Sequence, residues 1–175
     1  MLLFSAGTGK TMVVDCIFAY GTMRAEIDRW NMIDSNCQHL KAKACGFKLY
    51  QEYSLFYPFA TKTCKDSDVI EGSVLHWNDP VVFAHKLAGY DTIEGYSEDR
   101  ENGLYQRIVV DVEDENRQIR KAYMYIQDQS PEYIEECFAF ANGDWLDSTA
   151  TEHFDTEKKR IDQAARKILG RHGPK

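Results

Sequence analysis

Two short segments combine residue types that bind phosphate or metal ions in other proteins. Residues 7–11 read Gly-Thr-Gly-Lys-Thr and end like a phosphate-binding loop, in which the lysine contacts a phosphate. The complete motif needs a glycine where this chain has Phe4, and it needs a preceding strand, for which residues 1–3 are too short. Nucleotide binding is therefore not predicted, and we interpret residues 1–12 as a flexible leader.

Four further residues have side chains that zinc accepts as ligands, namely Cys37, His39, Cys45 and Cys64. Their spacing lacks the paired C-x-x-C units that hold tetrahedral zinc sites, so we expect ordinary cysteines and no metal centre. The chain has 5 cysteines, an odd number without the spacing of a disulfide framework. This usage favours a reducing, cytoplasmic location.

The segment Tyr20–Met23 has a composition that could bind an anion. It follows a β-branched and aromatic run, residues 13–20, which we predict to be a mostly buried strand. Gly21 would let the backbone approach a ligand, and successive N–H groups of such a turn can form a concavity for a carboxylate. The alternative is a plain tight turn after a strand.

The remaining pattern predicts several strands that would position this turn. Residues 24–42 are mixed in character and are predicted to be loop with at most a short helix. The predicted strands cover residues 13–20, 43–57 (a strand or a bent hairpin, with Gly46 as a bulge), 69–75, 105–112 and 119–126. The last two are separated by a charged connection, and we expect them to pair antiparallel.

Three helices are predicted between and after the strands. A short amphipathic one begins at Asp79-Pro80 and ends near Gly89. A second begins at Ser130-Pro131, runs through Phe140 and ends at Asn142-Gly143, and a third begins near the capping-box pattern Thr149–Glu152. Its apolar stripe consists of Phe154, Ile161, Ala165 and Ile168. This order predicts an α+β fold, a bent sheet or small mixed barrel with helices packed outside.

Composition limits the partners. The 175 residues, of which 43% are hydrophobic, suit one soluble globular domain. Lys and Arg number 21 against 28 Asp and Glu, and the net charge of −7 argues against binding to nucleic acid or an anionic membrane. No stretch reaches the ~18 apolar residues that would span a bilayer.

Three ordered segments resemble motifs of the gamma-glutamylcyclotransferase-like superfamily. Residues 18–24 (Phe-Ala-Tyr-Gly-Thr-Met-Arg) resemble its opening F-V-Y-G-T-L-R signature, residues 91–96 (Asp-Thr-Ile-Glu-Gly-Tyr) its L-D-x-x-E-G segment, and residues 104–110 its x-Y-x-R-x-x-V strand. Weaker landmarks occur at residues 46–50, 57–58, 70–75 and 143–145. The similarity spans about residues 13–147, which leaves residues 148–175 as a C-terminal helix and tail. Gamma-glutamylamine cyclotransferases and their plant defence-associated relatives resemble the chain most.

This resemblance implies both a fold and a reaction. The fold would be a small mixed α+β barrel with a cavity at one end. The reaction would convert a small gamma-glutamyl amine or peptide into 5-oxoproline and a free amine, without a cofactor. The substrate's own α-amine would be the nucleophile, so the protein would hold the glutamyl group in a bent conformation and move protons.

The resemblance also implies roles for individual residues. Glu94 would act as general base toward the α-ammonium and then as general acid toward the leaving nitrogen, which requires a pKa raised by a partly dry cavity. Tyr20, Gly21, Thr22 and Met23 would bind the substrate α-carboxylate. The Tyr105 phenol would donate to the substrate or to Glu94, although plain core packing is nearly as plausible.

Two neighbours of these residues are expected to be structural. Asp91 would cap or orient the turn before Glu94, and Arg107 would form an ion pair.

Two segments depart from the family pattern. Residues 25–30 (Ala-Glu-Ile-Asp-Arg-Trp) stand where relatives have a basic, glycine-containing turn, and residues 97–103 form a charged insertion that is either a lip over the cavity or a longer exposed loop. The first departure keeps a second hypothesis open, a non-catalytic binding or interaction module on the same barrel. The amine half of the substrate is not specified by these motifs.

Overall fold

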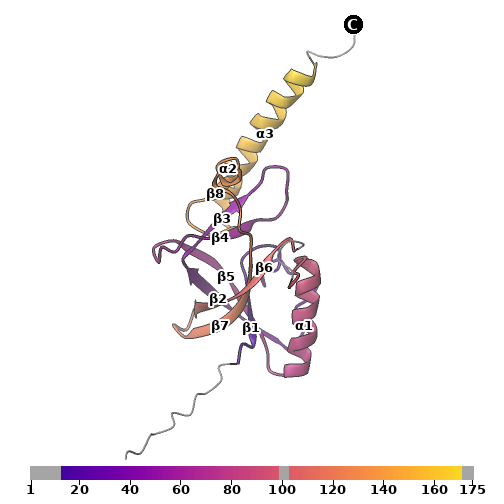
Figure 1. The fold of residues 1–175 in the computed structure, drawn as a ribbon, viewed down its shortest axis with the longest axis vertical. Coiled ribbons are helices and arrows are strands. Elements are labelled where there is room, and N and C mark those ends of the chain that lie inside the picture. Colours follow the sequence, from indigo (N-terminus) through magenta and orange to yellow (C-terminus); the bar gives the residue numbers. More distant parts are fainter. Residues whose placement is uncertain (1–12, 99–102, 171–175) are drawn as a thin grey trace, which may run out of the picture.

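The computed structural model describes residues 13–98 and 103–170, with side chains as far as residue 168. The predicted leader, the middle of the charged insertion and the last five residues lie outside the described residues. Figure 1 shows a barrel with a smaller sheet beside it and a long helix extending away. The elements in chain order are β1 (Cys16–Ala19), β2 (Cys37–Cys45), β3 (Phe47–Gln51), β4 (Phe59–Lys62), β5 (Val69–Trp77), α1 (Pro80–Ile93), β6 (Gln106–Asp114), β7 (Ile119–Ile126), α2 (Pro131–Glu135), β8 (Phe138–Phe140) and α3 (Ser148–Gly170).

Five strands close a mixed barrel in the order β1-β5-β2-β6-β7. The closing pair, β1 with β7, is parallel, with Cys16 opposite Ala122, whereas the other neighbours are antiparallel. This closed mixed barrel with helices outside confirms the predicted fold class. The strand predicted over residues 119–126 is confirmed without change, and so is its antiparallel pairing with β6.

All of β1 is buried because the strand has packed residues on both faces. Phe18 belongs to the cluster that fills the barrel together with apolar side chains from every barrel strand. Ile17 belongs to a second cluster under α1, which includes Phe83 and Tyr90 of that helix. The strand is therefore held on two sides, and the turn that follows it extends from a fully buried strand.

A second sheet, in the order β4-β3-β8, lies beside the barrel, and the observed strands of the two sheets correct three predictions. Residues 138–140 are a strand and not helix, because Phe138 and Phe140 alternate with exposed Ala139 and pack into the barrel cluster. The strand β4 was not predicted. The stretch predicted as loop, residues 24–42, contains the start of β2. This strand pairs with β5 over nine residues, but its polar residues do not form a recognisable strand pattern.

Gly46 separates the two sheets. It has a φ of +86°, and its N–H donates to the Asp68 carbonyl oxygen at 2.7 Å. The strand or bent hairpin predicted over residues 43–57 is therefore wrong in part. It covers the end of β2, this glycine and β3, which belong to different sheets, and residues 52–57 are not strand.

The helix α1 runs to Ile93 and does not end near Gly89 as predicted. Asp79 caps it as expected and accepts hydrogen bonds from the N–H groups of Val81 and Val82. A Cβ at Gly89 would lie 2.7 Å from Cε of Met32, so this glycine serves close packing and not helix termination. The extra turn places Glu94 at the C-cap.

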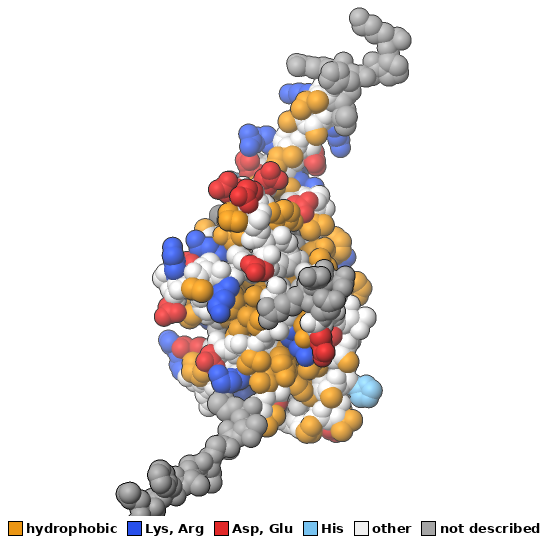
Figure 2. Space-filling view, viewed as in Figure 1, with side chains coloured by type: hydrophobic (Ala, Val, Ile, Leu, Met, Phe, Trp, Pro, Cys, Tyr) orange, Lys and Arg blue, Asp and Glu red, His pale blue; other side chains and the backbone are white. Residues whose placement is uncertain are grey.

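The C-terminal helix α3 begins at Ser148, and the side chain of Asp147 caps it by accepting from the Ala150 N–H at 2.8 Å. Of the predicted stripe only Phe154 is buried, and its ring stacks on Tyr53. Ile168 is exposed, which agrees with the outward direction of α3 in Figure 1. No helix in the described part of the chain is long and apolar enough to cross a membrane. Figure 2 shows acidic and basic side chains interspersed over the visible face of the barrel.

Two glycines with positive φ give a matched test of this packing. A Cβ at Gly143, φ +71°, would lie 1.9 Å from the Val69 carbonyl oxygen, whereas a Cβ at Gly46 would meet nothing within 4 Å. Gly46→Ala should therefore cost only the ~1–2 kcal/mol of the left-handed conformation, and Gly143→Ala should cost clearly more. Urea denaturation of both variants measures the difference, and equal losses would contradict the packing described here.

Candidate active site

A cavity of about 270 Å³ opens between the ends of β1 and α1 and the segments that precede β4 and β6. A cavity of this size can hold a small molecule. The structure brings all of the predicted site residues to its lining, although they come from distant parts of the chain. These residues are Tyr20, Gly21, Thr22, Met23, Glu94 and Tyr105.

Glu94 supplies the ionisable group of the cavity. It follows the last turn of α1, and its N–H donates to the Tyr90 carbonyl oxygen at 2.9 Å. Burial raises the pKa of its carboxyl group to about 7. Within the described residues, no hydrogen bond or ion pair engages this carboxyl group. The group is therefore free to take up and release a proton near neutral pH, as general acid–base catalysis requires.

The position of Glu94 is fixed from one turn earlier in the helix. The carboxylate of Asp91 accepts a hydrogen bond from the Tyr125 hydroxyl at 2.7 Å and forms an ion pair with Arg107. The Arg107 guanidinium also lies over the ring of Tyr96, 4.5 Å from its centroid. These contacts attach the end of α1 to β6 and β7. Asp91 is a positioning residue here and Arg107 is ion-paired, as the sequence predicted.

The turn after β1 presents free backbone donors. The carbonyl oxygen of Gly21 accepts from the Arg24 N–H at 3.0 Å, which closes the turn. The N–H groups of Gly21, Thr22 and Met23 donate to no group in the described chain. Three successive unpaired N–H groups beside a cavity can bind a carboxylate.

The Tyr20 side chain has a different function from the backbone that follows it. Its hydroxyl donates to the Tyr125 carbonyl oxygen at 2.6 Å and accepts from the Ala60 N–H at 3.1 Å. Burial, reinforced by the charge of Glu94, raises the pKa of this phenol, so it stays protonated. Tyr20 thus attaches the turn to β7 and β4, and we assign it a supporting role at the cavity wall.

Tyr105 differs from its expected role. Its hydroxyl donates to the carbonyl oxygen of Pro58 at 3.0 Å, and not to Glu94. Pro58 in turn packs so closely on Gly21 that a Cβ there would lie 2.9 Å from the proline Cγ. Tyr105 therefore holds the proline that shapes the turn, while its ring lines the cavity.

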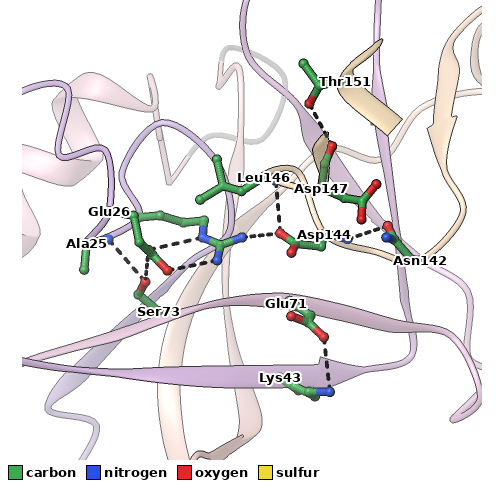
Figure 3. Close-up of polar contacts among 11 residues, drawn as sticks. Ala25, Glu26, Lys43, Glu71, Ser73, Asn142, Asp144, Leu146, Asp147 and Thr151 are labelled. Atoms are coloured by element: carbon green, nitrogen blue, oxygen red, sulfur yellow. Dashed lines mark hydrogen bonds and ion pairs between the residues drawn. The ribbon is translucent and has the colours of Figure 1, made fainter. Parts of the chain in front are cut away.

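An ionic cluster behind the turn was not foreseen from the sequence. Arg24 is 5% exposed, and its guanidinium contacts Glu26 at 3.1 Å and Asp144 at 2.6 Å. Glu26 also accepts from the Ser73 hydroxyl at 3.0 Å, and Figure 3 shows these acidic and hydroxyl groups coming together from separate segments. The motif residues Arg24 and 143–145 were recognised separately. Only the fold shows that they are partners that anchor the turn to β5 and to the segment before α3.

The cysteine and histidine residues considered as zinc ligands do not come together. The only compact group of His, Cys, Asp or Glu in residues 13–98 and 103–170 consists of Asp15, Cys16 and His76. It lies at the start of β1, at the opposite end of this strand from the candidate turn, and is not part of the cavity lining.

The model of a family described as gamma-glutamyl cyclotransferase, AIG2-like, matches residues 17–147. No curated protein matches the sequence.

Solved structures show the same fold. A protein from Arabidopsis thaliana is 20% identical, with a TM-score of 0.53 over 93% of this chain and 86% of its own. An uncharacterised protein from Pyrococcus horikoshii is 20% identical, with a TM-score of 0.50 over 81% of this chain and 96% of its own. An uncharacterised human protein is 19% identical, with a TM-score of 0.50 over 81% of this chain and 86% of its own.

The burial of Glu94 predicts a pH-dependent stability. Because its pKa rises from 4.5 to about 7 on folding, the folded protein keeps a proton that the unfolded chain has lost between these values. The free energy of unfolding should therefore fall as the pH rises through this range. Glu94→Gln, neutral at every pH, should gain up to about 3 kcal/mol over the parent between pH 4 and pH 8.

Urea denaturation at the two pH values measures this gain. The exposed Glu115→Gln variant is the control and should show no such change. A difference between Glu94→Gln and the parent that is the same at both pH values would mean that Glu94 titrates like an exposed residue.

Proposed function

Because this chain belongs to the gamma-glutamyl cyclotransferase, AIG2-like family, we propose that it is an enzyme converting a gamma-glutamyl amine or peptide into 5-oxoproline and a free amine. The observation that carries this proposal is the pairing of two features in one cavity. Glu94 has a pKa of about 7 and no hydrogen-bond or ion-pair partner for its carboxyl group among the described residues. It lies in the same lining as Gly21–Met23, whose N–H groups donate to no described residue.

Each of these two features binds a different group of the substrate's glutamyl half. The α-carboxylate binds the turn N–H groups, and the α-ammonium then lies toward Glu94, which removes one proton as carboxylate. The neutral α-amine attacks the γ-carbonyl carbon, forming the new C–N bond of a five-membered ring. The bond to the leaving nitrogen then breaks as Glu94 returns a proton to it. The ring nitrogen then gives its second proton to the Glu94 carboxylate, which passes it to the departing amine. The amine therefore leaves in its ammonium form, and Glu94 ends as the carboxylate that it was at the start.

The environment of Glu94 suits both halves of this cycle. A carboxyl group with an ordinary pKa would be almost fully ionised at neutral pH and a poor acid toward the leaving amine. Near pH 7 the half-buried Glu94 has substantial populations of both forms. No nucleophilic side chain is needed, because the nucleophile is part of the substrate and closure of the ring is intramolecular.

Substitution of Glu94 tests this role directly. Glu94→Gln keeps the size and the hydrogen-bonding capacity but cannot exchange a proton, so release of 5-oxoproline should fall by at least ~10²-fold. Glu115→Gln should behave like the parent. A Glu94→Gln variant that turns over at the parent rate would remove Glu94 from the mechanism. A parent that releases no 5-oxoproline from a broad panel of gamma-glutamyl compounds would favour a non-catalytic binding module.

Substitution of Gly21 tests the carboxylate site. A Cβ at Gly21 would lie only 2.9 Å from Cγ of Pro58. The branched side chain of Gly21→Val would therefore press against Pro58 and move the turn N–H groups. We expect binding of the product 5-oxoproline to weaken at least ~10-fold in calorimetric titration, with an unchanged β-sheet circular dichroism signal. Product binding as tight as that of the parent would contradict the assignment of this turn.

A further inference from the structure

Large apolar side chains are exposed at the mouth of the cavity. Trp30 is 49% exposed and Phe56 is 55% exposed, and both belong to the cavity lining. They come from separate loops, one after β1 and one between β3 and β4. Exposed apolar surface of this kind is costly to leave in water, and its convergence on a cavity marks a place where a ligand covers it.

The guanidinium of Arg29 lies over these two rings, and we call Arg29, Trp30 and Phe56 together the platform. The Arg29 guanidinium carbon is 4.3 Å from the ring centroid of Phe56 and 6.0 Å from that of Trp30. Arg29 is exposed and has no acidic partner within the described residues. Most guanidinium groups of this protein that lie near the barrel are ion-paired, as Arg24, Arg107 and Arg120 are. Among the described residues the side chain of Arg29 contacts only aromatic rings, and such a guanidinium keeps its donors available for a carboxylate.

The platform is attached to the turn that holds the glutamyl half. The Arg29 N–H donates to the Thr22 carbonyl oxygen at 3.2 Å. The Asp28 carboxylate accepts from the N–H groups of Met32 at 2.8 Å and Ile33 at 3.2 Å, which fixes the loop around Arg29 and Trp30. A preorganised platform loses little conformational entropy when a ligand binds.

We propose that Arg29, Trp30 and Phe56 form the subsite for the amine half of the substrate, and that this half carries an aromatic ring and a carboxylate. The inference rests on the proposed function, because it extends the substrate outward from the glutamyl half. The ring packs against Trp30 and Phe56, and the carboxylate pairs with Arg29. Residues 25–30 are also the segment in which this chain departs from the pattern of its relatives, as a segment that determines specificity would.

Three gamma-glutamyl compounds separate the two contacts. Gamma-glutamyl-phenylalanine has the ring and the carboxylate, gamma-glutamyl-alanine lacks the ring, and gamma-glutamyl-phenethylamine lacks the carboxylate. We expect kcat/KM for the phenylalanine compound to exceed that for the alanine compound about tenfold or more. It should exceed that for phenethylamine about two- to fivefold, as for an exposed ion pair.

Variants assign each preference to its residue. Trp30→Ala and Phe56→Ala should each reduce the phenylalanine-to-alanine ratio toward one, and Arg29→Gln should reduce the phenylalanine-to-phenethylamine ratio. The matched controls are exposed residues remote from the cavity, Ile119→Ala and Arg117→Gln, which should leave both ratios unchanged. Equal kcat/KM for all three compounds in the parent, or ratios unaffected by the platform variants, would overturn the proposal.

Binding to the Glu94→Gln variant separates this proposal from the catalytic one. Calorimetric titration with the same three compounds should give the same order of affinity, since the variant keeps both subsites. If the parent releases no 5-oxoproline but the affinities keep this order, the subsite stands and the proposed catalysis fails. If the parent cyclises all three compounds without preference and the affinities are equal, catalysis stands and the subsite is wrong.

Discussion

The ion pair between Asp91 and Arg107, together with the hydrogen bond from Tyr125, is the constraint on which the candidate site depends. An ion pair that is partly open to solvent adds little to the free energy of folding. Its value here is geometric. It fixes the last turn of α1 against two barrel strands, so that Glu94, which follows this turn, lies half-buried in the cavity with no partner for its carboxyl group among the described residues. Because burial of a carboxyl group without a partner is unfavourable, neighbouring residues must hold Glu94 in this position.

At the turn after β1, as at Glu94, the residues that give support differ from the polar groups that remain free. Side chains that look chemically capable, the phenols of Tyr20 and Tyr105 and the guanidinium of Arg24, are all engaged in holding backbone. They fix the turn whose N–H groups remain free. Among the described residues, a carboxyl group and a row of amides at the cavity have no partner, and the polar side chains that support them are hydrogen-bonded or ion-paired. The buried hydroxyl of Tyr90, also in the lining, has no partner there either. Fixed polar groups of this kind are a feature of a preorganised polar site.

The sequence predicts those parts of the fold and of the site that a local residue pattern specifies. The turn at Tyr20–Met23, Glu94 and the hairpin of β6 and β7 follow from motifs and from strand periodicity. The strand β8 could not be predicted, because Ser130-Pro131 signals where a helix starts and nothing local signals that it stops after Glu135. The platform at Arg29 and Trp30 was also missed, since its meaning lies in Phe56, a residue from another loop.

The parallel pairing of β1 with β7 has a consequence for the order in which the molecule assembles. The bond from the Tyr20 hydroxyl to the Tyr125 carbonyl oxygen joins residues 105 positions apart. Closing a loop of that length costs chain entropy before any contact compensates for it, which makes such pairings slow to form. The turn at Tyr20–Met23, the proposed carboxylate site, therefore gains this support only after β7 has joined the barrel. While β7 is still inside the ribosome, the nascent chain contains the Tyr20–Met23 motif but has not yet formed the candidate site.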